Sequence, residues 1–147
     1  MNAIIEAGAY TVLDTLLTVE DERNYIATLA ERGVFNVAVE GGHGRIVGLQ
    51  SVEPFASCTR AFAHVGSIGT FVELSVRRQG LGTRLSETTF QDARRAGYEK
   101  VFTYVCADNP GSLAFQLKLG FRIVGTAEKH AKLRGRYVDE IVIERFL

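Results

Sequence analysis

The chain carries, between residues 72 and 83, the stretch Val72-Glu73-Leu74-Ser75-Val76-Arg77-Arg78-Gln79-Gly80-Leu81-Gly82-Thr83. A strand-like apolar run, residues 63–72, leads into this stretch, and a helix-like run, residues 83–96, leads out of it. Glycine lets the backbone bend tightly and come close to a ligand. A helix that starts here points unsatisfied N–H groups and the positive end of its dipole at whatever lies before it. The stretch therefore predicts an anion site, and phosphate is a typical anion at such a helix end.

Three kinds of phosphate loop have glycines at similar spacing. A P-loop ends in Gly-Lys-Ser/Thr, whereas Thr83 directly follows Gly82 here, which disfavours nucleotide hydrolysis. A dinucleotide loop has Gly-x-Gly-x-x-Gly after the first strand of its fold, and this chain has only Gly-x-Gly, deep in the sequence. The third pattern, Arg/Gln-x-x-Gly-x-Gly/Ala, is met by residues 77–82, which resemble the pyrophosphate loop of the GNAT N-acetyltransferase superfamily. Alone, this pattern also fits a tight turn with solvated charges.

A second segment, residues 106–121, resembles the second motif of the same superfamily. It contains Asn109-x-x-Ser112, a short helix-like run and Leu119-Gly120-Phe121. The resemblance extends from about residue 34 to residue 147. Within the superfamily, residues 64–69 and 135–140 are similar to the bacterial phosphinothricin and L-amino-acid N-acetyltransferase branch. That branch implies a small primary amine that also carries an acid group, for which Arg60, Arg134 and Arg136 are candidate anchors.

Composition limits the possible partners. The 147 residues predict one domain, residues 1–147, with 17 basic and 17 acidic residues and no formal net charge. This balance argues against a nucleic-acid surface, which needs a basic excess. No apolar run has the length of a membrane span and no signal-peptide pattern opens the chain, so a cytoplasmic protein without membrane contact is expected.

Metal or disulfide chemistry is not expected from the sequence. Cys58 and Cys106 are the two cysteines, and their separation is not that of metal ligands. His43, His64 and His130 form no cluster, so we expect no metal site.

Periodicity predicts an α/β domain. The fold class implied by the resemblance is a GNAT-like mixed, mostly antiparallel sheet flanked by helices. Members usually open with a strand and a helix before the region of Thr18, and residues 1–17 are too short for both, so the N-terminal strand is expected to be missing or shortened, with residues 2–6 as a remnant of the first helix. The expected helices are 18–32, 83–96 and 111–119; the expected strands are 34–39, 45–52, 63–72, 100–105, 121–126 and 137–146; the expected connections include a hairpin turn at 40–44 and loops at 54–60 and 128–135.

The resemblance implies that acetyl-CoA is the cosubstrate. It also implies that the central strand, residues 63–72, diverges from the strand at 100–105, that the pantetheine arm fills the gap, and that an N–H near Phe71 or Val72 faces the thioester oxygen. The residues expected to bind the cofactor are Phe71, Val72, Leu74, Arg77, Arg78, Gln79, Gly80, Leu81, Gly82, Thr83, Asn109, Ser112 and Gln116.

The acid and the base of the reaction are less well defined. Gln116 stands where many members have a tyrosine that protonates the leaving thiolate, and an amide cannot give up a proton at neutral pH. Tyr104 and Tyr137 are substitutes by residue type. His64 is the candidate base, since strand alternation would put it on the face of Gly66. Glu53 and Glu140 are further options for the base.

Three functions follow from these residues. The first is acetyl-CoA-dependent N-acetylation of a small primary amine by direct attack on the thioester. The second is an acyl-CoA-binding or sensing module with weak or vestigial catalysis, because the usual acid position holds Gln116. The third is acetylation of a protein amine. A homodimer is the default expectation, because members of the superfamily often dimerise.

Overall fold

The computed structural model describes all 147 residues, with the exception of the side chain of His43. The helices are α1 (Asn2–Ala7), α2 (Val19–Ala27), α3 (Leu81–Arg95) and α4 (Pro110–Lys118). The strands are β1 (Val34–Glu40), β2 (Arg45–Pro54), β3 (Val65–Val72), β4 (Lys100–Cys106), β5 (Arg122–Leu133) and β6 (Arg136–Phe146). Short 3-10 turns at Gly41–His43, Arg60–Phe62 and Leu74–Val76 lie in three of the connections.

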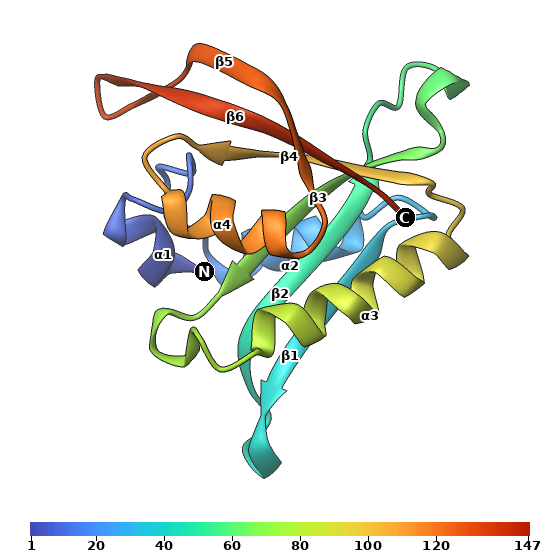
Figure 1. Cartoon of the computed structure of the whole chain (residues 1–147). Helices are drawn as coiled ribbons and strands as arrows, with labels where there is room; N and C mark the ends of the chain where they lie inside the picture. The colour runs from blue at the N-terminus through green and yellow to red at the C-terminus, as the bar shows by residue number, and fades with distance from the viewer.

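One six-stranded sheet, ordered β1-β2-β3-β4-β6-β5, forms the middle of the molecule. All neighbouring strands are antiparallel except β3 and β4, which are parallel. Figure 1 shows α3 and α4 on the side of the sheet towards the viewer and α2 behind it. The predicted fold class is confirmed, and the first strand of the described chain, β1, comes after two helices.

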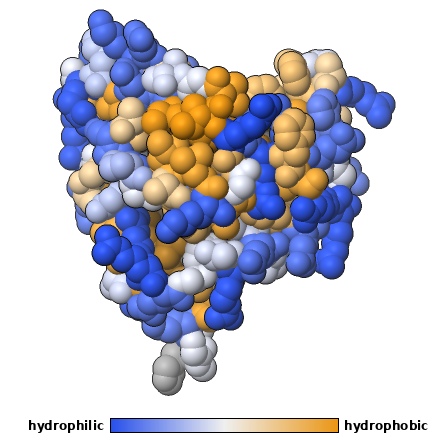
Figure 2. Space-filling view, viewed as in Figure 1, coloured by the Kyte–Doolittle hydropathy of each residue, from blue (hydrophilic) through white to orange (hydrophobic). Residues whose placement is uncertain are grey.

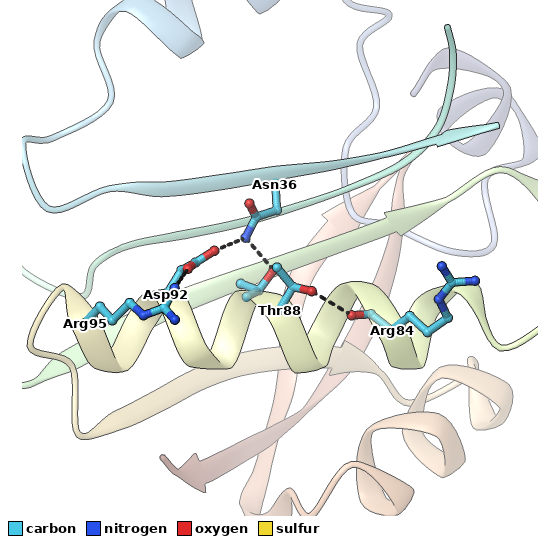
Figure 3. Close-up of polar contacts among 6 residues, drawn as sticks. Asn36, Arg84, Thr88, Asp92 and Arg95 are labelled. Atoms are coloured by element: carbon cyan, nitrogen blue, oxygen red, sulfur yellow. Dashed lines mark hydrogen bonds and ion pairs between the residues drawn. The ribbon is translucent and has the colours of Figure 1, made fainter. Parts of the chain in front are cut away.

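The core lies between α3 and the sheet. Alternate residues of the strands, among them Val52, Ile68 and Val101, pack against Phe90 and Ala93 of α3. Polar contacts hold the same helix to the edge strand β1, where the Asn36 amide donates to Asp92 Oδ2 at 3.1 Å and to Thr89 Oγ1 at 3.2 Å (Figure 3). The position of α3, and with it of the loop at its N-terminus, is thus fixed by both apolar and polar contacts.

The outer surface of this side changes character from one end to the other. Figure 2 shows mainly hydrophilic side chains over α3 and over the far end of the β5–β6 ribbon, and an apolar region between them around α4. Exposed apolar residues of α4 and β5 include Leu117, Ile123 and Val124. The hydrophilic covering of α3 agrees with a helix that buries one side only.

Two predicted elements have different ends from those expected. Thr18 caps α2 in a capping box with Asp21, as a helix start requires, but the helix ends at Ala27 rather than at residue 32. None of its residues is buried, and Ile26 is 48% exposed.

The predicted polar loop at 128–135 is wrong. β5 continues to Leu133 and joins β6 through Arg134 and Gly135, which have φ values of 49° and 83°. Two successive left-handed residues are typical of the tight turn that joins two twisted antiparallel strands. The register also shifts between Ala127 and Ala131, and this irregularity hid the strand periodicity in the sequence. The expected helix near residues 2–6 is present as α1.

Candidate active site

The loop before α3 has the backbone of an anion site. Arg78 has a φ of 63° and Gly80 a φ of 76°, so two residues of this short loop are left-handed. Gly80 is the N-cap of α3 and no side chain caps the helix; the first helical bond runs from Arg84 N–H to Gly80 O at 3.1 Å. The N–H groups of the first turn are therefore left for a ligand. A non-glycine residue held in the left-handed region is strained, and such strain often marks a functional loop.

Positive charge collects at this helix end. Arg78 and Arg84 are exposed, and no acidic residue lies in the first turn of α3. Figure 3 shows the Arg84 side chain extending towards the N-terminal end of the helix. Cations are unfavourable near the positive end of a helix dipole unless an anion is bound there. The charge pattern thus favours the same anionic ligand as the backbone does.

Arg77 has a different role from the one predicted. Its Nε donates to Val72 O at 3.2 Å, and its guanidinium lies 4.3 Å from the ring centroid of Tyr10. The side chain is half-buried between the end of β3 and the N-terminal segment. We therefore assign Arg77 to holding the loop against β3 rather than to contacting the anion.

Gly82 is required by a close approach of α4. A Cβ atom at this position would lie 3.0 Å from Phe115 Cζ, which is tighter than ordinary van der Waals contact. Gly80 has open space around it and is required by its φ instead. The two glycines of the motif thus serve separate purposes, and α4 packs directly on the first turn of α3.

A gap opens between β3 and β4 above this loop. The two strands pair only at Val65–Lys100, Gly66–Val101 and Ser67–Phe102, and beyond these pairs they diverge, as Figure 1 shows. The remaining part of β3, up to Val72, therefore has no partner on that side. The divergence expected from the resemblance is present.

The register of β3 identifies which backbone groups face the gap. Glu73 N–H donates to Val47 O at 2.9 Å and Phe55 N–H donates to Val65 O at 3.1 Å, so the odd-numbered residues of β3 turn their backbone groups to β2. Hydrogen-bonded pairs alternate along antiparallel strands, so Thr70 and Val72 turn theirs to the gap. Of the two candidates for the oxyanion donor, Val72 faces the gap and Phe71 does not. Thr70 also turns its backbone groups to the gap, which the sequence motif did not indicate.

Leu74 does not lie on the central strand. It opens the 3-10 turn Leu74–Val76 and is 38% exposed. Its side chain lines, with Phe71 and Ile4 of α1, a cavity of about 220 Å³ on the α1 side. A larger groove of about 340 Å³ runs along α3 from Thr83 and is also outside the gap. Leu74 is therefore not placed to offer backbone groups as the strand residues do.

The second motif lies at the start of α4. Asn109 is the N-cap of this helix, and its Oδ1 accepts a hydrogen bond from Ser112 N–H at 3.1 Å. Asn109 therefore caps the helix, and its Nδ2 group is not used in that bond. Gln116 is buried on α4, 6% exposed.

His64 lies outside β3, in an exposed turn before the strand. Its carbonyl oxygen accepts hydrogen bonds from Glu99 N–H and Lys100 N–H, at 2.9 and 3.1 Å, where β3 and β4 are still paired. At about 3.3 Å per residue, eight residues of extended chain separate it from Val72 by about 26 Å. The strand-alternation argument for His64 as the base is therefore wrong.

Tyr104 lies on β4, two residues beyond Phe102, which is the last residue of β4 that pairs with β3. Its side chain is 42% exposed. Its ring stacks on His130 at 5.4 Å, and His130 Nε2 lies 3.9 Å from Glu140 Oε2, a buried carboxylate on β6. Tyr104 thus stands beside the open part of the gap with two titratable neighbours.

A second polar pair was not found from the sequence. The Tyr25 hydroxyl of α2 donates to Glu53 Oε1 of β2 at 2.5 Å. Burial and the hydrogen bond to Glu53 raise the pKa of Tyr25 to about 12, so the phenol keeps its proton at neutral pH. Glu53 is the register partner of Ser67, the last residue of β3 that pairs with β4. No local pattern shows this contact, because the two residues are 28 positions apart.

Among the residues whose side chains are described, no group of three or more His, Cys, Asp or Glu side chains is arranged to hold a metal ion. None of the helices described here is both long and apolar enough to cross a bilayer.

Comparisons with known proteins agree with this geometry. The profile of the Acetyltransferase (GNAT) family matches residues 5–121. The chain belongs to this family of acetyltransferases. A search of curated protein sequences finds no significant match.

Several solved structures share the fold over nearly the whole chain. A ribosomal-protein-alanine N-acetyltransferase from Brucella melitensis has a TM-score of 0.87 at 23% identity, over 99% of this chain and 89% of the other. A GCN5-related N-acetyltransferase from Kribbella flavida has a TM-score of 0.81 at 26% identity, over 99% and 87%. A phosphinothricin acetyltransferase from Sinorhizobium meliloti, solved in complex with acetyl-CoA, has a TM-score of 0.88 at 18% identity, over 99% and 78%.

Proposed function

We propose that the protein transfers an acetyl group from acetyl-CoA to a small primary amine. Acetyl-CoA supplies the thioester: the amine nitrogen forms a bond to its carbonyl carbon, the carbon–sulfur bond breaks, and sulfur leaves with the electron pair. Bringing the two reactants together in the gap accounts for much of the acceleration, since a second-order reaction becomes effectively unimolecular.

One observation carries this proposal: the unpaired part of β3 leads directly to the uncapped N-terminus of α3. The loop from Arg78 to Thr83 offers main-chain N–H groups and the positive helix end to a diphosphate. The gap is bordered by the backbone of Thr70 and by the N–H of Val72, whose carbonyl accepts from Arg77 Nε, and it can take an extended arm. The two parts together fit a long ligand with phosphates at one end and a reactive group at the other.

The residues along the gap have distinct roles in the proposed reaction. The N–H of Val72 or Thr70 stabilises the negative charge that develops on the thioester oxygen. Asn109, through its free Nδ2 group, and Ser112 assist in holding the arm. Gln116, buried on α4, can donate a hydrogen bond but supplies no proton. A thiol with a pKa of about 8.5 leaves as thiolate without a strong acid.

Family resemblance alone favours an amino acid or an analogue of one as the acceptor, whereas the groups beside the gap, described below, favour a different amine. The phosphinothricin acetyltransferase among the similar structures agrees with the amino-acid class. A homodimer is a further prediction of the same resemblance, and a cytoplasmic location is the prediction made from the sequence pattern.

Calorimetric titration with acetyl-CoA, followed by thiol release with a panel of amines, tests the proposal. We expect micromolar-range binding and turnover with at least one amine. Arg78→Ala should weaken acetyl-CoA binding about 3- to 10-fold and more strongly at low salt, because the charge is exposed. The exposed Arg23 of α2 serves as the matched control, and Arg23→Ala should leave the affinity unchanged. Absence of acetyl-CoA binding would refute the proposal.

The alternative, a binding or sensing module, is favoured by the amide at Gln116 in place of an acid. It predicts tight binding of acetyl-CoA without turnover on any amine. Acetylation of the N-terminus or lysines of a protein, with no activity on small amines, would instead support the third function.

A further inference from the structure

The sheet presents a second face, opposite to α3 and α4, on which the acceptor can reach the gap. Gln50 of β2 donates to Ser86 of α3 at 3.1 Å, and Val52 belongs to the α3 core, so these residues point to the helix side. Side chains alternate along a strand, so Ser51 and Glu53 point to the opposite face. The register extends this face to the other strands: Glu53 pairs with Ser67 of β3, and Ser67 with Phe102 of β4.

Glu53 supplies a carboxylate on this face next to the point where β3 and β4 part. The protonated phenol of Tyr25 donates to one of its oxygens, Oε1, at 2.5 Å. The buried hydroxyl of Ser51 lies at the same phenol. The second oxygen of Glu53 makes no contact in this pair, so the carboxylate is held in place and still able to accept a hydrogen bond.

A row of aromatic rings starts beside this carboxylate and crosses the same face. Ring centroids are 5.4 Å apart for Phe62 and Phe55, 5.2 Å for Phe55 and Phe102, and 5.1 Å for Phe102 and Tyr104. Phe55, Phe62 and Tyr104 are 40, 43 and 42% exposed. A contiguous exposed apolar surface is uncommon and marks a site for a ligand or partner. Phe102, in the middle, lies one strand away from Ser67, at about 4.8 Å, and so directly at the opening of the gap.

Two of the arginines expected to anchor an acid group have other partners. Arg136 Nη2 lies 3.0 Å from Asp108 Oδ2. The guanidinium of Arg134 lies against Gly8, where an added Cβ would be 3.1 Å from Nη1. Lys100, on the same face as Phe102, pairs with Glu144 at 2.7 Å. Arg60, the third candidate, lies in the exposed turn Arg60–Phe62. Glu144 is paired with Lys100 and Arg122, and Glu140 faces His130. Glu53 and the rings beside the gap suit a cationic amine with an aromatic substituent rather than an amino acid.

We infer that the acceptor is a primary amine with an aromatic substituent and no carboxylate, whose ring packs on Phe55, Phe62, Phe102 and Tyr104 and whose nitrogen is linked to Glu53 through water. Glu53 lies level with Ser67, about 10 Å of extended strand from Thr70, so water carries the proton over this distance. This inference rests on the proposed N-acetyltransferase function and names its substrate class. The bound ammonium first loses one proton, which passes through water to Glu53. The neutral nitrogen then forms its bond to the acetyl carbon, the carbon–sulfur bond breaks and the thiolate leaves with the electron pair, and the second proton released by the nitrogen passes through water to the thiolate. Glu53 is then a catalytic residue, and Tyr25 positions it.

The test compares three amines on the full-length protein by thiol release: 2-phenylethylamine, n-propylamine and L-phenylalanine. We expect kcat/KM for 2-phenylethylamine to exceed that for each of the other two by at least about tenfold. Phe62→Ala and Phe55→Ala should raise KM for 2-phenylethylamine about 3- to 10-fold, the effect of one lost ring contact, and leave KM for n-propylamine unchanged. Phe146, 63% exposed and outside the row, is the matched control, and Phe146→Ala should change neither.

Glu53→Gln should lower kcat about 100-fold or more with every amine and leave the Kd of acetyl-CoA unchanged. Glu20→Gln, at an exposed position of α2, is its control and should be neutral. Equal kcat/KM for the two amines without a carboxylate, or a preference for L-phenylalanine, would overturn the substrate class while leaving the acetyltransferase intact. Absence of turnover on every amine refutes the proposed function itself, and calorimetry with acetyl-CoA then shows whether binding has also been lost.

Discussion

Replacing Gly80 by alanine tests the left-handed backbone conformation of the loop before α3, because the added methyl group would make no steric clash. Gly80 has a φ of 76°, and an added Cβ would meet no atom within 4 Å. The cost of Gly80→Ala therefore comes from the backbone alone, about 1–2 kcal/mol for an L-residue in the left-handed region. For a chain of this size, that corresponds to a fall in Tm of about 2–8 °C.

A matched control lies in the β1–β2 connection. Gly44 has a φ of 71° and equally open surroundings, so Gly44→Ala should lose the same stability. Only Gly80→Ala moves the main-chain amides at the N-terminus of α3, so only this variant should bind acetyl-CoA more weakly, by about tenfold. Gly80→Asn should restore both properties in large part, because asparagine enters the left-handed region readily and is a good N-cap.

The assays are thermal unfolding for stability and isothermal calorimetry with acetyl-CoA for affinity, at one salt concentration. If Gly80→Ala is destabilised like Gly44→Ala but binds acetyl-CoA as the wild type does, the loop is not the diphosphate site. If Gly80→Ala shows no loss of stability at all, the left-handed conformation assigned to this residue is wrong.

Three further predictions concern stability. Gly66→Ala should destabilise the protein by about 1–3 kcal/mol in urea unfolding, since its Cβ would lie 2.5 Å from Val52 Cγ1 in the core; Gly125→Ala, with open space around it, should be close to neutral. Thr18→Ala removes the capping box of α2 and should cost about 1 kcal/mol, seen as faster amide exchange in residues 19–27; unchanged exchange would contradict the capping role. Hydrogen bonds from Lys100 and Arg122 lower the pKa of Glu144, so its ionised form stabilises the native state above the ordinary carboxyl pKa and this contribution is lost as the pH falls through the folded value. Wild type should therefore lose more stability than Glu144→Gln between pH 7 and pH 3, and parallel pH profiles of the two would refute this linkage.

Much of the fold could be predicted from local patterns. β4 alternates Val101 and Val105, which are buried, with Phe102 and Tyr104 on the other face, and this period appears in the sequence. The capping residue Thr18 also marked the start of α2 correctly. The end of that helix and the strand at residues 128–133 were not predicted, because the sequence has no regular apolar periodicity at either place.

For the site residues too, local features were predicted from the sequence and features that depend on neighbouring elements were not. The sequence pattern indicated the loop at residues 77–83 and the segment at Asn109, where the chain itself brings the residues together. It assigned Arg77 to the anion, whereas this side chain holds Val72 O and Tyr10. It placed His64 on the central strand, whereas the strand begins at Val65. Both errors concern side-chain direction and strand ends, which neighbouring elements decide.

The sequence by itself determined the glycine turn, the helix that starts there and the alternating strands, because these depend on the conformational preferences of residues adjacent in the chain. Only the tertiary structure decided which backbone groups of β3 face the gap, that Tyr25 holds Glu53, and that the rings from Phe62 to Tyr104 form one row. These features join residues from separate elements, and their positions follow from strand register and packing across the whole sheet. The proposed chemistry therefore depends on contacts that no single segment of the chain encodes.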